Sequence, residues 1–194
     1  MPDFNLLLVL TGLLGLTAYS TAVYQMLIGT YSPSFFSRGV WFLLGINSFI
    51  GVYLGGGSDA SIVLAATLLL GNIAVFLVSY KKGSREFGSV EKISLVLLFV
   101  ATFVWLVLDA PFITLVISLM AHLIGGLPTI WRTLKNPESE QAWHWYFFFA
   151  GAILSIFASP DKTLTAILFP AYFAVFDGLI IFLANRKRFQ RDFG

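Results

Sequence analysis

The ionisable residues of this chain are confined to short connectors between long apolar runs, and this pattern constrains the fold more than any other feature. Only 11% of the 194 residues are charged and 58% are hydrophobic, whereas a soluble domain carries about 25% charged residues. A helix needs about 20 apolar residues to cross the ~30 Å hydrocarbon core of a bilayer. The chain is therefore predicted to be an all-α integral membrane protein without a separate soluble domain.

Polar and turn-forming residues divide the chain into seven predicted transmembrane helices. Tyr31-Ser32-Pro33-Ser34 and the glycine-rich stretch 55–59 are typical turns, because Pro fixes φ, Ser bonds to nearby backbone and Gly accepts unusual φ values. Asp109-Ala110-Pro111 splits an apolar run that is too long for one span. The predicted spans cover residues 4–28, 38–55, 60–80, 92–108, 112–132, 142–159 and 163–185.

This threading sorts the basic residues to one face of the membrane. Of the twelve Lys and Arg residues, only Lys162 falls at the opposite face. The positive-inside rule then predicts a cytoplasmic C-terminus and an N-terminus outside, in a bacterial inner membrane or a plasma membrane. The cations at the predicted cytoplasmic face are Arg38, Lys81, Lys82, Arg85, Lys92, Arg132, Lys135, Arg186, Lys187, Arg188 and Arg191.

Several functional classes lose support from composition. The chain has no Cys, which removes disulfides, thiolate catalysis and Cys-based metal sites. No paired carboxylates, nucleophile with base or phosphate loop is found, so we do not expect an enzyme or a cofactor. The basic residues serve topology and leave no nucleic-acid surface. Two His and one intramembrane Asp on separate spans do not make a metal site.

A weak internal repeat relates the two ends of the chain. A shift of 104 residues places Pro33 on Pro137 and Trp41 on Trp145, and one further residue places Asn72 on Asp177. Three spans, a linking span and three more spans would make the two copies parallel, as in many transporters. The predicted organisation is two parallel three-helix bundles, at 1–80 and 111–194, joined by a cytoplasmic loop and linker helix at 81–110.

This 3+1+3 pattern resembles the PQ-loop superfamily, which includes the SWEET sugar transporters, and the PnuC vitamin transporters are similar in architecture. Tyr24-Gln25 and Pro128-Thr129 each keep one half of the family's Pro-Gln pair. In SWEET-like proteins an Asn in the third helix of each repeat contacts substrate; Asn72 matches this position, and Asp177 replaces the second copy. The family's Trp near the outer end of the second helix is missing, which weakens a sugar assignment specifically.

Four polar residues inside apolar spans are candidate substrate contacts: Asn72, Asp177, Asn47 and His122. An intramembrane Asp is costly, so we interpret Asp177 as a substrate contact or proton-binding carboxylate, with a structural tie between helices as the alternative. For Asn72 the alternative is an interhelical hydrogen bond, and Asn47 has the same ambiguity. His122 could relay protons or neutralise Asp177, and the alternative is a neutral histidine bonded to a neighbouring helix.

A second group of residues suggests moving parts. Pro128 removes a helical hydrogen bond next to Gly125 and Gly126, so the fifth span contains either a hinge or a static kink. Tyr24 and Gln25, at the position of the family's Pro-Gln pair, are candidate gate residues. Trp41 and Trp145 are candidates for an inner gate, although Trp is also enriched at membrane interfaces as an anchor.

Together these patterns predict a membrane transporter that moves a small polar solute by alternating access, with proton coupling through Asp177 as a hypothesis. The solute classes considered are vitamins or nucleosides, sugars, and amino acids. The alternative is a non-transporting membrane receptor or sorting protein of the same architecture. The sequence leaves the substrate and the oligomeric state open.

Overall fold

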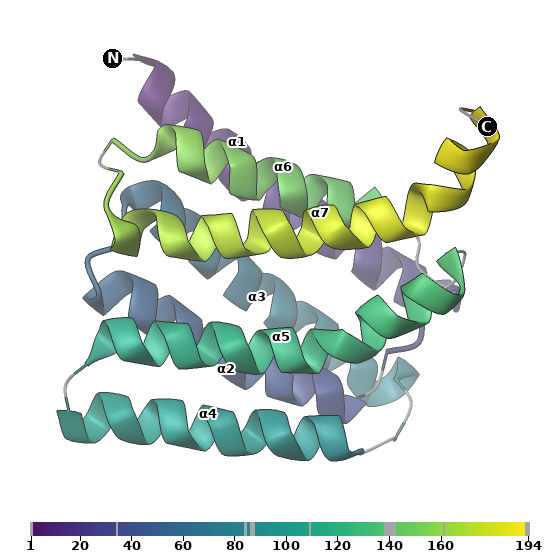
Figure 1. Ribbon diagram of the computed structural model, residues 1–194, viewed down its shortest axis with the longest axis horizontal. Helices are drawn as coiled ribbons and strands as arrows, with labels where there is room; N and C mark the ends of the chain where they lie inside the picture. Colours follow the sequence, from purple (N-terminus) through teal and green to yellow (C-terminus); the bar gives the residue numbers. More distant parts are fainter. Residues whose placement is uncertain are drawn as a thin grey trace.

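The computed structural model describes residues 2–33, 35–83, 85, 88–108, 110–137, 143–160 and 162–192, and these residues form helices and turns without a strand. Figure 1 shows long helices lying side by side, with the connections at the two ends. The helices are α1 (Pro2–Leu27), α2 (Phe35–Leu54), α3 (Asp59–Lys82), α4 (Ser89–Leu108), α5 (Pro111–Lys135), α6 (Trp143–Ala158) and α7 (Leu164–Asp192).

Local chemistry explains where these helices begin and end. At the end of α1, Gly29 adopts φ +81°, and the amides of Thr30 and Gly29 donate to the carbonyls of Gln25 and Met26 at 3.0 and 3.3 Å. This pattern is a Schellman cap, which satisfies carbonyls that the helix leaves unpaired. At the start of α3, the Ser58 hydroxyl accepts the Ser61 amide, as expected of an N-cap. The turns predicted at 31–34 and 55–59 therefore form as the sequence indicates, as far as their residues are described, whereas Ser34 and Asp109 lie outside the described residues.

Each predicted span corresponds to one helix, with one large difference in length. The prediction for the last span stops at residue 185, whereas α7 continues to Asp192. A basic segment ends a transmembrane span, but without Pro or Gly it does not end a helix. The two termini lie at opposite ends of the molecule in Figure 1.

Six of the helices form a closed ring. α1 packs against α3 and α6, α2 packs against α3 and α5, and α7 packs against α5 and α6. Around the ring the order is therefore α1, α3, α2, α5, α7, α6. α4 lies outside the ring, against α5 and α2, at the lower edge of Figure 1.

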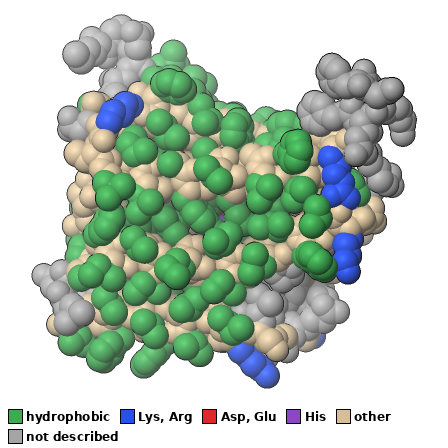
Figure 2. All heavy atoms as spheres, in the orientation of Figure 1, with side chains coloured by type: hydrophobic (Ala, Val, Ile, Leu, Met, Phe, Trp, Pro, Cys, Tyr) green, Lys and Arg blue, Asp and Glu red, His purple; other side chains and the backbone are tan. Residues whose placement is uncertain are grey.

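The outer surface is apolar and its charges lie at the ends. Figure 2 shows hydrophobic side chains across the visible face, with Lys and Arg side chains near its edges. Phe99 and Val175 are 72% and 74% exposed, which suits contact with lipid but not with water. The protein is therefore membrane-embedded.

Among the described residues, four stretches are long and apolar enough to cross a membrane. They are Leu6–Leu27, Asp59–Lys82, Pro111–Lys135 and Leu164–Arg186. Shorter apolar stretches run over Arg38–Leu54, Lys92–Val104 and Trp143–Ala158, in α2, α4 and α6.

Close approach between α1 and α3 depends on a glycine. A Cβ atom added to Gly71 in α3 would lie 1.9 Å from the ring of Tyr19 in α1. The ring thus occupies the space that any larger residue at position 71 would need. Gly12 in the same interface is different, because its Cβ would meet Val63 at 3.5 Å, an ordinary contact.

We expect Gly71→Ala to lower the free energy of unfolding by about 1–3 kcal/mol, because overpacking displaces the Tyr19 ring. The matched control is Gly12→Ala, which has room and gains helix propensity. Both are measured by thermal unfolding in the same detergent. Equal unfolding temperatures for the two variants would contradict the close contact.

Candidate functional site

A pocket lies inside the ring of six helices. The space between its atoms is about 500 Å³, a volume that includes space open to the outside. Each of the six ring helices contributes to its lining, whereas no described side chain of α4 does. The lining residues are Tyr19, Ala22, Tyr31, Arg38, Trp41, Leu68, Val75, His122, His144, Trp145, Phe148, Phe173 and Asp177.

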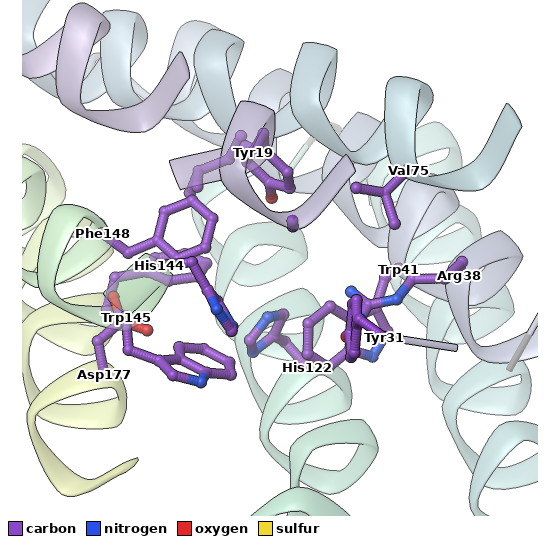
Figure 3. Close-up of a pocket in the computed structure, with 13 residues that line it drawn as sticks. Tyr19, Tyr31, Arg38, Trp41, Val75, His122, His144, Trp145, Phe148 and Asp177 are labelled. Carbon is purple, nitrogen blue, oxygen red and sulfur yellow. The ribbon is translucent and has the colours of Figure 1, made fainter. Parts of the chain in front are cut away.

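The pocket extends from the middle of the ring towards the end where α2 and α6 begin. Arg38 and Trp41 belong to the first two turns of α2, and His144 and Trp145 to the first turn of α6. Asp177, in contrast, lies midway along α7. Figure 3 shows Arg38 and Asp177 on opposite sides of the pocket.

The guanidinium of Arg38 is held by aromatic groups. It donates a hydrogen bond to the hydroxyl of Tyr31, and its Cζ atom lies 4.8 Å from the centroid of the Trp41 ring. Arg38 and Trp41 are three residues apart on one helix, so their side chains share a face. Cation–π contact of this kind stabilises a positive charge away from water without neutralising it.

His122 connects three helices of the ring. Its Nδ1 atom forms a 2.8 Å hydrogen bond with the Tyr172 hydroxyl on α7, and its ring centroid lies 4.7 Å from that of Trp41 on α2. The Phe173 ring packs edge-on against it at 5.1 Å. His122 thus forms a hydrogen bond to a neighbouring helix, which was one of the predicted alternatives. It also lines the pocket.

Two buried polar atoms in the lining have no hydrogen-bond partner among the described residues. Asp177 is 1% exposed and its Oδ2 atom is unpaired, and His144 is 5% exposed with an unpaired Nδ1 atom. Most buried polar groups in proteins are hydrogen-bonded, and the exceptions concentrate where a ligand or water binds. These two atoms therefore mark the polar part of the pocket.

The other two predicted substrate contacts do not line the pocket. Asn72 is 7% exposed, its Oδ1 atom has no partner among the described residues, and its amide nitrogen faces Gly45 on α2. Asn47 faces α4, where its amide donates to the Thr102 hydroxyl at 2.9 Å. Asn47 thus ties the outlying helix to the ring, which matches the structural alternative for this residue.

The predicted hinge residues make room for aromatic rings. A Cβ on Gly125 would lie 3.0 Å from Nε1 of Trp41, and one on Gly126 would lie 2.5 Å from the Phe176 ring. Helix α5 is continuous through position 128, and the side chain of Pro128 is outside the described residues. Gly125 and Gly126 therefore have a packing role beside any role in bending.

The predicted gate residues separate into two pairs. Trp41 and Trp145, which the repeat places at equivalent positions, both line the pocket. Tyr24 is 61% exposed, so its side chain faces outwards, and Gln25 is buried but lies outside the lining. The structure thus brings together the tryptophan pair and leaves the Tyr-Gln pair on other faces of α1.

Sequence reasoning missed most of the pocket's polar and aromatic wall. Arg38 was predicted only to be one of the cations at the cytoplasmic face, although its spacing from Trp41 places both residues on one face of a helix. His144 shares the start of α6 with Trp145, which was a usable signal. Tyr172 stands in an apolar run, Tyr19 among Thr and Ser residues, and Tyr31 in a turn, so none of the three had a distinguishing pattern.

Serine hydroxyls connect neighbouring elements at the opposite end of the ring. Ser58, in the turn between α2 and α3, lies 2.6 Å from Ser159, in the turn after α6, measured between the Oγ atoms. The Ser61 hydroxyl donates to the carbonyl of Ala166 on α7 at 2.5 Å. Ser61 and Ser159 are 0% and 2% exposed, so this contact between the two turns and α7 is tightly packed.

A comparison of the chain with protein-family models, with curated proteins and with solved structures finds no match. The ring, its pocket and its serine contact are therefore the features from which a function can be inferred.

The two buried polar residues Asp177 and Asn47 should respond differently to substitution. Asp177→Asn keeps the shape of the side chain and removes no hydrogen bond at Oδ2, so we expect an unfolding temperature equal to or above that of the wild type. Asn47→Ala removes the bond to Thr102 and leaves a small cavity, at a cost of about 1 kcal/mol. Thermal unfolding in detergent measures both; a larger loss for Asp177→Asn would make Asp177 a structural tie.

Proposed function

We propose that this protein is a membrane transporter that moves a small polar solute by alternating access, with the solute bound in the ring pocket. The observation that carries the proposal is a pocket lined by all six ring helices, with a serine contact between two turns at the opposite end of the ring. Solute sites of transporters lie between structural repeats near the middle of the membrane.

The proposal includes seven membrane spans in a 3+1+3 arrangement. α2, α4 and α6 are shorter than the four long spans but pack side by side with them. The ring order supports two equivalent halves: in α1, α3, α2 and again in α5, α7, α6, the third helix lies between the first and second. With α4 as the linker, the halves would be parallel repeats, in line with the resemblance to the PQ-loop superfamily.

The proposed orientation puts the end with Arg38 in the cytoplasm. Lys81 and Lys82 end α3 and Lys135 ends α5, so these cations lie at the same end as the start of α2, whereas Lys162 precedes α7 at the other end. The positive-inside rule then assigns the first end to the cytoplasm and the N-terminus to the outside. The serine contact would be an outer gate in its closed state.

Asp177 is the proposed coupling residue. A carboxyl group that is buried within a membrane protein and faces a cavity is a natural proton-binding site. Its side chain lines the pocket, so protonation and solute binding would occur at the same place. The proposed transport cycle therefore couples solute movement to proton binding at Asp177.

The test locks the proposed outer gate. The chain has no Cys, so Ser58→Cys together with Ser159→Cys introduces the only pair able to form a disulfide. The double variant and the wild type are reconstituted in liposomes, and uptake of radiolabelled sugars, nucleosides, vitamins and amino acids is measured. We expect uptake by the double variant to fall at least tenfold on oxidation and to recover on reduction, because a disulfide prevents the gate from opening.

The single variant Ser159→Cys under the same oxidation is the matched control and should keep its uptake. Undiminished uptake by the oxidised double variant would contradict the gate. Solute binding by the wild type without uptake of any solute would favour a receptor or sorting protein instead.

A further inference from the structure

The Arg38 end of the pocket presents a positive charge. The guanidinium contacts the Tyr31 hydroxyl and the rings of Tyr31 and Trp41, at 5.6 and 4.8 Å from their centroids. None of these partners is a carboxylate. Among the described residues, the Arg38 guanidinium therefore has no anionic partner in these contacts. A guanidinium with donors left over binds carboxylate or phosphate strongly.

At the Asp177 end of the pocket, a buried hydrogen-bond acceptor lacks a donor among the described residues. Asp177 Oδ2 is buried in the pocket wall and has no hydrogen-bond partner among the described residues. An unpaired buried carboxyl oxygen is expensive unless a ligand or water completes it. An N–H or O–H donor on a bound solute would satisfy it. Because Arg38 and Asp177 lie on opposite sides of the pocket in Figure 3, one solute can meet both only with its two groups at opposite ends.

Aromatic rings form the walls between these two ends. Tyr19 and Phe148 pack edge to face with their centroids 4.8 Å apart, and Trp41 lies beside His122 on the other side. The Trp145 ring is 7% exposed and lines the same space. Rigid flat surfaces favour a flat solute, because rings gain dispersion and quadrupole contacts that a puckered molecule cannot make.

We propose that the pocket binds a planar aromatic solute with an acidic group at one end, held by Arg38, and a hydrogen-bond donor at the other end, held by Asp177. This inference rests on the proposed function for the role of the pocket, but it concerns binding and does not require transport. It deepens the proposal by excluding solutes with only one of the three features, such as neutral sugars and simple organic cations.

Four probes separate the three features in wild-type protein. 4-Aminobenzoate has all of them, 4-aminobenzamide lacks the negative charge, benzoate lacks the donor, and 4-hydroxycyclohexanecarboxylate keeps the carboxylate and an uncharged donor but lacks the flat ring. Binding is measured by isothermal titration calorimetry in lipid nanodiscs. We expect 4-aminobenzoate to bind at least about tenfold more tightly than each of the others, since each loses a charged hydrogen bond, a buried hydrogen bond or ring contact.

Variants assign each preference to its residue. Arg38→Gln should abolish the preference for 4-aminobenzoate over 4-aminobenzamide and keep its preference over benzoate. Asp177→Asn should weaken the preference for 4-aminobenzoate over benzoate and keep its preference over 4-aminobenzamide. Lys135→Gln is the matched control, because Lys135 is a cation at the same end of the molecule whose ammonium lies over the exposed ring of Trp131. It should keep both preferences.

Equal affinity of the wild type for 4-aminobenzoate and 4-aminobenzamide would overturn the proposal, as would the absence of binding by all four probes. The relative affinities of the four probes for the wild type test the proposed binding mode even where a variant does not fold. Selective binding without uptake into liposomes would leave this inference standing and refute transport alone.

Discussion

Lipid supplies no hydrogen bonds, and the rest of the structure depends on this constraint. Any polar side chain within the membrane must find a partner inside the protein or face an internal cavity. Asp177 and His122 accordingly face the inside of the ring, while α4 presents Phe99 to the outside. The ring is thus the arrangement that keeps these polar groups away from lipid and gathers them around one pocket.

Small residues allow the ring to close around large aromatic ones. Without a hydrophobic driving force between helices, association depends on packing and hydrogen bonds, so backbones must approach closely. Gly71 makes room for Tyr19, Gly125 for Trp41, and Gly126 for the Phe176 ring. Each glycine lies on a different helix from the ring that it accommodates. The shape of the pocket wall therefore follows from where the glycines allow two helices to meet.

The helices and their turns could be predicted from sequence because their causes are local. Apolar runs of sufficient length, Pro33, the glycines at 55–57 and Asp109-Ala110-Pro111 mark the boundaries without reference to the rest of the chain. The end of α7 was placed seven residues early, because loss of hydrophobicity ends a span but not a helix. Pocket residues were predicted where polarity contrasted with an apolar run, as at Asp177 and His122, or where the repeat paired two residues, as at Trp41 and Trp145.

The sequence by itself determined that the chain forms apolar helices with their basic residues near one end, because length, hydrophobicity and turn chemistry act within a few residues. It also singled out Trp41, Trp145, His122 and Asp177. Only the tertiary structure decided that these four share a pocket and that Asn47 faces α4 instead. The physical reason is that all faces of an apolar helix have similar hydrophobicity, so the sequence does not distinguish them. Packing against the neighbouring helices determines which face is turned inwards.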